Sequence, residues 1–293
     1  MTGLQARQLF ELTHRRNETK HISNVYHYTT ADITNLILRE EDICLQMTRM
    51  DNFEDKLEGK TVDSFYQKAL KKLLKENKLS KSQYELMVKI EAPQKNLTAF
   101  EEEKGIYRGE ITESDIYITC FSKEKNDSYM IKKYIKNDKH SGYCLDFSCC
   151  NLESNEITNH CCGTGLSFKM LIVKYEKEAI LEMCKFIEEL LKIFDGCDDE
   201  LEKHSSGVIK TKLNELKYAT KRKKFQKEKE VRLILIAPKG QMPYETLKIH
   251  FEPSEKGCII KLPRYVVHDI NKSPNLTDEE DKKWREIFKQ RGY

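Results

Sequence analysis

The order in which strand-like and helix-like segments follow one another constrains the fold of this chain most. A strand, a helix and a second strand come first; a lysine-rich helical region follows at 56–112, and later strands surround a helical insertion at 176–229. Because strands and helices do not alternate regularly, this order disfavours a doubly wound parallel sheet and predicts an α+β fold with a mixed sheet. Alternating or β-branched runs predict strands at 25–29, 43–48, 116–121, 142–147, 169–175, 230–237, 247–252 and 257–262. Helical periodicity predicts helices at 31–39, 61–90, 127–136, 176–194 and 208–227.

No internal repeat and no linker rich in proline or glycine divides the 293 residues. This length is sufficient for one large domain or two small ones. We predict a single domain over 1–293, with its core at about 25–270 and a C-terminal helical tail at 271–293. The segments at about 61–112 and 176–225 are then helical insertions into that core.

The chain lacks the sequence features of a membrane or exported protein. No segment comes near the roughly 20 consecutive apolar residues of a membrane-spanning helix, and the first residues do not have the pattern of a signal peptide. We therefore expect a cytoplasmic protein without a membrane partner, whose ten cysteines are thiols. The net charge is only +3, because 51 Lys and Arg oppose 48 Asp and Glu, so overall charge argues neither for nor against nucleic acid.

Two cysteine pairs raise the question of a zinc site. Cys149-Cys150 and Cys161-Cys162 flank a short segment, and His160 adjoins the second pair. Adjacent cysteines do not easily aim at one tetrahedral ion, and the usual C-x₂-C spacing is absent. We therefore predict reduced cysteines and no metal.

A histidine occupies the middle of the first predicted strand. Val25, His27 and Thr29 share one face of that strand, whereas Tyr26 and Tyr28 share the other. The simplest interpretation of His27 is an interior histidine with satisfied hydrogen bonds. Thr30 is a suitable N-cap for the helix that follows.

Two glutamates and an arginine alternate at the entrance of a strongly apolar strand. Glu228, Glu230 and Arg232 lie on one face if the extended stretch begins at 228. Paired carboxylates there suit hydrogen bonding to sugar hydroxyls, or stabilisation of positive charge in a transition state. The alternative is a solvated strand entrance with a Glu–Arg ion pair.

A basic run precedes these glutamates. This run is able to steer a phosphate-rich ligand such as NAD, or a nucleic acid; the alternative is a solvated helix face. Its cations are Lys217, Lys221, Arg222, Lys223, Lys224, Lys227 and Lys229.

The block at 120–147 follows the order strand, polar turn, short helix and strand. Ser122, Ser128 and Tyr134 are polar groups near its turns. Gly142 precedes the last strand, where a glycine often permits close approach of another backbone.

Five motifs in order resemble a known family over about residues 25–270. They are similar to those of bacterial domain-of-unknown-function family 2971, which in turn resembles the ADP-ribosyltransferase-like superfamily. The motifs read "VYHYTT", "MDNFED", "CFSKEKNDSYMIKKYIKNDKHSGYCLDF", "KRKKFQKEKEVRLI" and "IIKLPRYVV". The chain departs from the family pattern at four places: the turn 51–54 lacks a proline, Ile131 and Phe225 replace tryptophans, and Lys133 replaces a histidine.

The resemblance implies a split, mixed sheet of ADP-ribosyltransferase-like type that clamps NAD, into which the predicted helical segments are inserted. In the superfamily a first-strand histidine or arginine contacts a ribose hydroxyl, a tyrosine or serine lies near the nicotinamide, and a late-strand glutamate supports catalysis. Carried over by position, these are His27, Tyr134 and Glu230, with Glu228 as the other half of the pair. Further side chains expected at the NAD site are Tyr28, Thr29, Ser122, Ser128 and Arg232.

The function that this resemblance implies is cleavage of the nicotinamide–ribose bond of NAD. The ADP-ribose would pass to a protein or nucleic acid, in the setting of a bacterial toxin or phage-defence effector with an antitoxin or defence-system partner. The alternatives are an NAD glycohydrolase, with water as the acceptor, and a non-catalytic module that binds a nucleotide or a partner.

Overall fold

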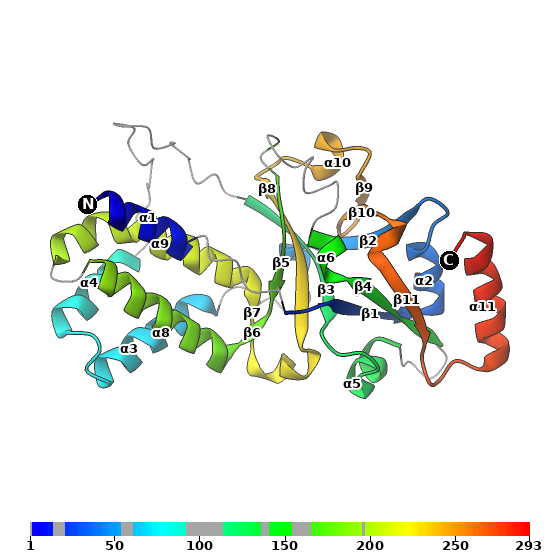
Figure 1. Cartoon of the computed structure of the whole chain (residues 1–293), viewed down its shortest axis with the longest axis horizontal. Coiled ribbons are helices and arrows are strands. Elements are labelled where there is room, and N and C mark those ends of the chain that lie inside the picture. The colour runs from blue at the N-terminus through cyan, green and yellow to red at the C-terminus, as the bar shows by residue number, and fades with distance from the viewer. Residues whose placement is uncertain are drawn as a thin grey trace. The chain divides into compact units, whose positions relative to one another are not determined.

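The computed structural model describes residues 2–13, 21–53, 61–91, 114–135, 141–153, 164, 166–194 and 197–293. Its architecture is α+β, and its elements form two compact units (Figure 1). We call Met1–Arg16, Leu57–Thr112 and Lys174–Phe225 the helical unit, and Asn17–Lys56, Glu113–Val173 and Gln226–Tyr293 the sheet unit. The single domain with two insertions stays a prediction; in the structure both predicted insertions fall in one unit with the N-terminal helix.

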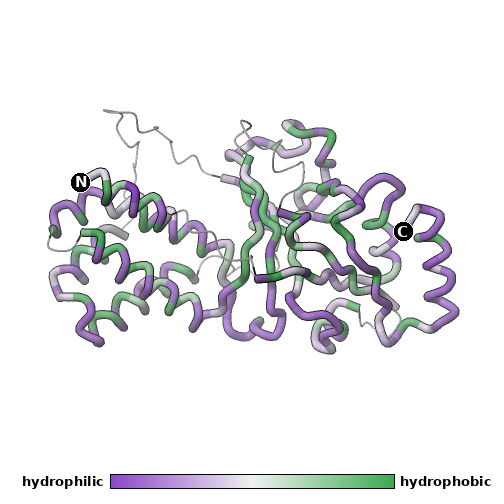
Figure 2. The backbone as a smooth tube through the Cα atoms, in the orientation of Figure 1, coloured by the Kyte–Doolittle hydropathy of each residue, from purple (hydrophilic) through white to green (hydrophobic). Residues whose placement is uncertain are grey.

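The helical unit is built from amphipathic helices around one core. Its elements are α1 (Gly3–Thr13), α3 (Val62–Lys75), α4 (Lys81–Glu91), α8 (Glu176–Ile193), α9 (Asp198–Ala219) and the short parallel pair β6 (Lys174–Tyr175) and β7 (Thr220–Lys221). Hydrophobic and hydrophilic residues alternate along these helices, as Figure 2 shows. Each helix contributes to the core, for example Leu9, Phe65, Met87, Ile187 and Ile209.

Two predicted helices differ from those in the structure. The run at 61–90 is two helices, because Asn77 adopts the left-handed conformation (φ 56°) that ends a helix, and Ser80 caps α4 by accepting from the Gln83 N–H at 3.1 Å. The run at 208–227 begins earlier and ends earlier. Its helix α9 starts with three acidic residues, which favour a helix N-terminus, and it gives way to extended backbone at Thr220.

The sheet unit contains a nine-stranded sheet in which every pairing is antiparallel. The expected mixed sheet is therefore replaced by an antiparallel one, and the parallel pair described lies in the helical unit. Its strands are β1 (Asn24–Thr30), β2 (Asp42–Arg49), β3 (Ser114–Ser122), β4 (Gly142–Ser148), β5 (Ser167–Ile172), β8 (Glu230–Pro238), β9 (Phe251–Ser254), β10 (Gly257–Pro263) and β11 (Val267–Lys272).

The sheet forks at β3. One edge of β3 pairs with β8 over its whole length, and β8 pairs in turn with β5. The other edge is shared: β1 joins it only at Tyr26, opposite Ser122, whereas β2 joins it at Thr48 and Arg49. Beyond β1 lie β4 and β11, and beyond β2 lie β10 and β9.

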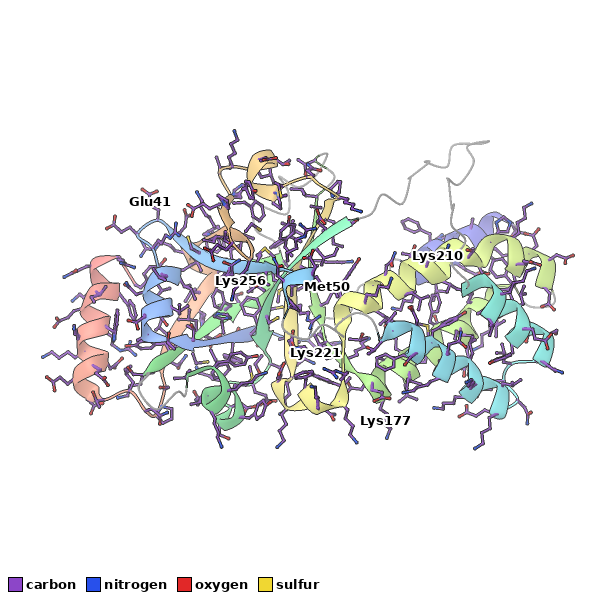
Figure 3. The ribbon with its side chains drawn as sticks, turned by 180° about the vertical axis from the view of Figure 1, so that it is seen from behind. Glu41, Met50, Lys177, Lys210, Lys221 and Lys256 are labelled. Carbon is purple, nitrogen blue, oxygen red and sulfur yellow. The ribbon has the colours of Figure 1, made fainter. Side chains whose placement is uncertain are left out.

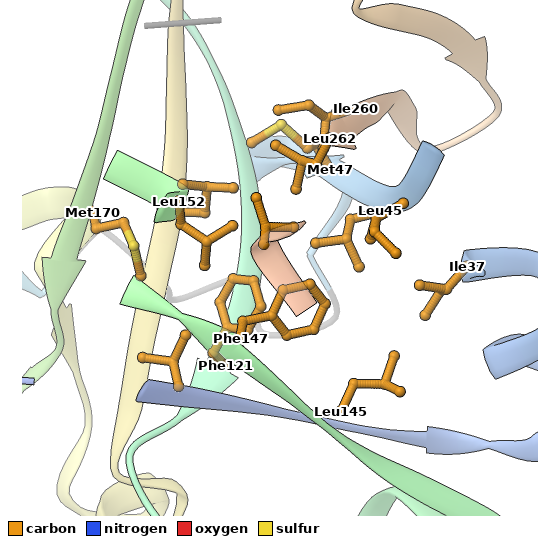
Figure 4. Close-up of a cluster of buried hydrophobic side chains, with 14 of the residues drawn as sticks. Ile37, Leu45, Met47, Phe121, Leu145, Phe147, Leu152, Met170, Ile260 and Leu262 are labelled. Carbon is orange, nitrogen blue, oxygen red and sulfur yellow. The ribbon is translucent and has the colours of Figure 1, made fainter. Parts of the chain in front are cut away.

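One hydrophobic core joins both branches of the fork to the β5–β8–β3 part. Figure 4 shows Leu145 and Phe147 of β4 in the same cluster as Leu45 and Met47 of β2. Phe121 of β3 lies with them, and its ring contacts that of Phe147 with centroids 5.3 Å apart. This shared core fixes which face of each strand is buried.

The helices of the sheet unit connect its strands or, in the case of the last one, follow them. They are α2 (Ala31–Ile37), η1 (Met50–Asn52), α5 (Ser128–Met130), the π-helical η2 (Ile131–Ile135), α6 (Cys149–Glu153), α10 (Pro243–Thr246), η4 (Arg264–Val266) and α11 (Asp278–Gln290). Thr30 caps α2 as predicted, by accepting from the Ile33 N–H at 3.4 Å. No helix in the described ranges combines the length and apolarity needed to cross a membrane.

Two strands at the edge of the sheet differ from the prediction. The strand predicted at 247–252 occupies 251–254, because Leu247–His250 forms a turn in which the His250 N–H bonds to the Leu247 carbonyl at 2.9 Å. Strand β11 was not predicted. It is a partly exposed edge strand, so its polar sequence "VHDINK" lacks the hydrophobic alternation of a half-buried strand.

Gly142 lies where backbone approaches backbone, as its position predicted. A Cβ atom there would lie 2.3 Å from the Thr29 carbonyl oxygen and 2.8 Å from Ile135 Cγ2. We expect Gly142→Ala to destabilise the fold by about 1–3 kcal/mol, the usual range for an overpacked site. Urea unfolding measures this, with Gly3→Ala as the control, since nothing lies within 4 Å of a Cβ at Gly3. Equal midpoints for the two variants would contradict the prediction.

Candidate functional site

Glu228 and Glu230 lie two residues apart in the chain, but they belong to different elements. Glu228 ends the 3₁₀ helix η3 (Lys223–Glu228), and Glu230 begins β8. Between them Lys229 adopts a left-handed conformation with φ 44°. The prediction that Glu228 shares a strand face with Glu230 is therefore wrong, because the extended stretch begins at 230. Both side chains are nevertheless buried, each residue being 2% exposed.

Glu230 forms a buried ion pair with Arg232. The Arg232 Nε donates to Glu230 Oε1 at 2.6 Å, and Arg232 is completely buried, with its guanidinium 5.9 Å from the ring centre of Phe53. Burial lowers the pKa of Arg232 to about 9. The two side chains share a face because they are two residues apart on β8. The Glu–Arg pair is thus present, but it is not the solvated strand entrance that we considered.

Glu228 is held by Lys133, which lies on the π-helical segment η2. The Lys133 ammonium donates to Glu228 Oε1 and lies 4.9 Å from the ring centre of Tyr134. Burial alone would lower the pKa of Lys133, but the bond to Glu228 and the nearby Tyr134 outweigh it and raise the pKa. Tyr134 itself is 43% exposed, and burial of its polar end, followed by the charge of Glu228, raises its pKa to about 12. The structure therefore brings two of the three predicted catalytic residues, Glu228 and Tyr134, together around Lys133, whereas Glu230 bonds to Arg232.

Ser122 and Tyr28 hold the backbone around this site. The Ser122 hydroxyl donates to the Glu228 carbonyl at 3.0 Å and accepts from the Glu124 N–H at 3.2 Å. The Tyr28 hydroxyl donates to the Glu124 carbonyl at 2.5 Å and accepts from the Asp127 N–H at 3.0 Å. Both hydroxyls were predicted to bind a ligand; in the structure they fix the turn that follows β3.

Thr29 lies on β1 and Ser128 on α5. Thr29 is buried on β1, opposite Tyr143 of β4. Ser128 is an exposed first residue of α5, whose N-cap is Asp127.

His27 lies at the fork of the sheet. Its Nδ1 is 3.1 Å from the Cys120 carbonyl oxygen, at the point where β1 has left the β3 ladder, so the imidazole replaces a backbone hydrogen bond. Its ring contacts Phe121 edge-on, with centroids 5.8 Å apart. Burial lowers the pKa of His27, so the ring is neutral at pH 7 and Nδ1 donates to the carbonyl. This geometry agrees with the simplest interpretation of His27, a histidine whose hydrogen bond is satisfied by another part of the protein.

A row of polar side chains crosses five strands on the other face of the sheet. Residues directly opposite each other in antiparallel strands share a face, and the registers align Glu230 with Ser122, Ser122 with Tyr26, Tyr26 with Asp146, and Asp146 with Asp269. His27 follows Tyr26 by one residue and contacts Phe121, so its ring lies on the opposite face from Glu230.

Asp146 is a site residue that the sequence analysis missed. It is 3% exposed, and among the described residues its Oδ1 has no hydrogen-bond partner. Lys125 Nζ lies 3.6 Å from Asp146 Oδ2 and 3.5 Å from Asp269 Oδ2. Burial raises the pKa of Asp146, and burial followed by the charge of Asp146 raises that of Tyr26. A charged residue within the apolar run "GYCLDF" was the signal that could have identified it.

We expect Asp146→Asn to stabilise the protein at neutral pH. A buried carboxylate with an unmet hydrogen bond costs about 1–3 kcal/mol. Its folded-state pKa lies above the unfolded value, so this cost is present at high pH and disappears as pH falls toward the unfolded pKa. The thermal midpoint should therefore rise by a few degrees at pH 7–8 and not at pH 4. Asp269→Asn is the control, because this exposed carboxylate shares Lys125; an equal shift for both variants would refute the assignment.

The proposed absence of a metal stays a prediction. The cysteines in the described ranges are free thiols, with Cys149 buried and Cys150 exposed. Cys161, Cys162 and His160 lie outside the described residues. Among the residues that are described, no group of three side chains could hold a metal ion.

Comparison with known proteins gives no relative. No protein-family model, curated protein or solved structure matches the chain.

Proposed function

We propose that the chain is an NAD-dependent ADP-ribosyltransferase-like enzyme that cleaves the nicotinamide–ribose bond and modifies a protein or nucleic acid. The observation that carries this proposal is the burial of Glu228 and Glu230, each 2% exposed and each ion-paired with a cation. Burying two neighbouring carboxylates is costly, and such arrangements concentrate at functional sites. The forked sheet supports the more specific proposal that the core is a split sheet of ADP-ribosyltransferase-like type.

Glu230 would stabilise the charge that develops during bond cleavage. Breaking the bond to nicotinamide leaves oxocarbenium character on the ribose, and a carboxylate beside the 2′-hydroxyl both orients the sugar and stabilises that charge. Arg232 fixes the orientation of Glu230 through its Nε bond of 2.6 Å. Glu228 would accept the proton of the acceptor group, and the exposed ring of Tyr134 would stack on nicotinamide.

Lys133 gives the site a means of opening. Its side chain is 35% exposed, so a phosphate of NAD can compete with Glu228 for the ammonium. Transfer of Lys133 to the phosphate would release the Glu228 carboxylate when the dinucleotide binds. The ribose contact that the resemblance gives His27 is not part of this proposal, because the His27 ring lies on the other face of the sheet.

One observation favours the second candidate, a non-catalytic nucleotide-binding module. Both carboxylates are covered and ion-paired in the structure, as expected for a site that only organises its surroundings. A bacterial toxin or phage-defence role, with an antitoxin or defence-system partner, remains a proposal by analogy with the superfamily.

Incubation with NAD separates these candidates. Release of free nicotinamide, followed by chromatography, supports the enzyme; protection from heat by NAD without release supports the module. Labelled NAD then shows whether ADP-ribose remains free, as for a glycohydrolase, or is attached to protein or nucleic acid in a cell lysate. Neither release nor binding at millimolar NAD would refute the proposed function.

A further inference from the structure

One carboxylate of the sheet unit is buried with an oxygen that accepts no hydrogen bond. Glu41 of the same unit is exposed, and its side chain extends outward from the ribbon in Figure 3. Asp146 on β4 is instead 3% exposed, and within the described part of the chain its Oδ1 has no hydrogen-bond partner. Both oxygens of an ionised carboxylate accept hydrogen bonds, so Asp146 can take a donor from a ligand.

Four side chains lie around the Asp146 carboxylate. Lys125 Nζ is 3.6 Å from Asp146 Oδ2 and 3.5 Å from Asp269 Oδ2. Tyr26 and Asp269 are the residues directly opposite Asp146 on β1 and β11, so their side chains share its face of the sheet. His268 lies within electrostatic reach of Asp146. We call Tyr26, Lys125, Asp146, His268 and Asp269 the Asp146 cluster.

Strand β11 carries a β-bulge at this cluster. Its register against β4 shifts between Val267, which pairs with Phe147, and Asp269, which pairs with Asp146. His268 is therefore the extra residue of the bulge. Bulges redirect side chains and are frequent beside functional sites. This bulge places two titratable residues next to a buried carboxylate, which the packing of an edge strand does not require.

The cation already present indicates what the cluster binds. The Lys125 ammonium is shared between Asp146 and Asp269, and both of its distances exceed the roughly 2.7–2.9 Å of a strong charge-assisted hydrogen bond. A guanidinium carries its N–H donors in a planar fork, so two of them meet both oxygens of one carboxylate at once. The ring of Tyr26, on the same face, offers its π surface to such a cation. The cluster therefore suits a guanidinium better than the ammonium that it holds.

The cluster lies just beneath the protein surface. The side chains of Lys125 and Asp269 are 38% and 52% exposed. Lys125 belongs to the turn after β3, in which Asn126 adopts a left-handed conformation with φ 58°. Exposed ion pairs are weak, so the ammonium can turn into solvent at little cost and leave its place to an incoming cation. The exchange keeps a cation at the two carboxylates and adds a donor for Asp146 Oδ1.

We propose that the Asp146 cluster binds a guanidinium group, carried by a small molecule or by an arginine of a partner protein. The guanidinium displaces Lys125, donates to both oxygens of Asp146 and lies against Tyr26. This site goes beyond the proposed function. Glu230 lies three strands away in the same row, about 14 Å at the usual spacing of strands, so the two sites can be tested separately.

The test measures binding of N-acetylarginine amide without NAD, by NMR on the ¹⁵N-labelled protein. We expect chemical-shift changes at residues 145–147 and 268–270, with a Kd of about 1 mM for a ligand of this size. Asp146→Asn should bind about 10- to 100-fold more weakly, because the neutral amide cannot form the charge-assisted pair. The matched control is Asp32→Asn, which removes an exposed carboxylate of α2 in the same unit and should bind like the unchanged protein.

Lys125→Met should have the opposite effect. Methionine removes the competing ammonium, so binding should tighten by about two- to fivefold, the equivalent of the exposed ion pair that the guanidinium no longer breaks. Lys132→Met is the control, because it removes an exposed ammonium of η2 and should leave the affinity unchanged. A cluster with a purely structural role would give the same affinity in both lysine variants.

Three outcomes would overturn the proposal. They are no chemical-shift change at about 50 mM amide, equal binding by the unchanged protein and Asp146→Asn, and equal binding of N-acetyllysine amide, which would show no preference for a guanidinium. A five-residue peptide with one arginine among glycines identifies the source: tighter binding than the amide assigns the guanidinium to a protein, and equal binding assigns it to a small molecule. Because NAD is absent, a failure to release nicotinamide would refute the proposed function and leave this site standing.

Discussion

Replacing Arg232 by methionine should destabilise the protein by about 3–5 kcal/mol, because the buried Glu230 would lose its ion pair with Arg232. The guanidinium is completely buried, and its Nε bonds to Glu230 at 2.6 Å. Methionine fills a similar volume, so little of the loss should come from a cavity. Urea unfolding followed by tryptophan fluorescence or circular dichroism gives the free energy of unfolding.

The double variant Arg232→Met/Glu230→Leu tests whether the cost arises from the unpaired charge. Replacing both members of a buried pair by apolar groups is often neutral or stabilising, so the double variant should be more stable than Arg232→Met alone. The matched control is Arg285→Met, which removes an ion pair with Asp281 at 3.0 Å from an arginine that is 51% exposed. Exposed pairs contribute about 0–1 kcal/mol. If Arg232→Met cost no more than Arg285→Met, the buried pair would have no special role.

The strands that contribute to the hydrophobic core were predictable from the sequence, whereas the edge strand β11 was not. The runs around Val25, Leu45, Phe121, Leu145 and Leu233 all form strands, because apolar alternation reports burial directly. Strand β11 is polar because half of an edge strand faces water. The order in which strands pair depends on contacts between segments far apart in the chain. The fork at β3 and the antiparallel pairing of the strands therefore could not be predicted from a sequence pattern.

The candidate site was predicted in its residue types but not in its local geometry. Glu228 and Tyr134 do come together, because Lys133 of η2 contacts both side chains. Ser122 of β3 bonds to the Glu228 carbonyl and holds the chain just before β8. The left-handed Lys229 has no sequence signal, since lysine rarely adopts that conformation, and it removes Glu228 from the strand.

The forked sheet gives His27 a physical reason for its position. A strand that leaves its neighbour exposes backbone carbonyls, and each buried carbonyl needs a donor. His27 Nδ1 supplies that donor to Cys120 on the side where β1 diverges from β3. A titratable residue in mid-strand is therefore explained by hydrogen bonding at the fork, without a role in proton transfer.

Replacing Glu230 by glutamine should reduce nicotinamide release by about 100- to 1,000-fold at saturating NAD, if the carboxylate stabilises the ribosyl cation. Glutamine keeps the size of the side chain and one oxygen acceptor, so NAD affinity should change far less than the rate. The variant also removes the charge of Glu230 from its ion pair with Arg232, so a lower thermal midpoint is expected, and rates must be compared well below that midpoint.

Glu228→Gln serves as the comparison, because it removes the same charge from the other half of the pair. If Glu228 accepts the proton of the acceptor, its loss should reduce transfer to nucleic acid or protein more than hydrolysis of NAD, whereas Glu230→Gln should reduce both equally. Thermal shift with and without NAD reports folding and binding for each variant. A folded Glu230→Gln protein with full turnover would remove the catalytic role. The buried carboxylates would then be explained by the nucleotide-binding module, in which Glu230 orients Arg232 and Lys133 meets the phosphates.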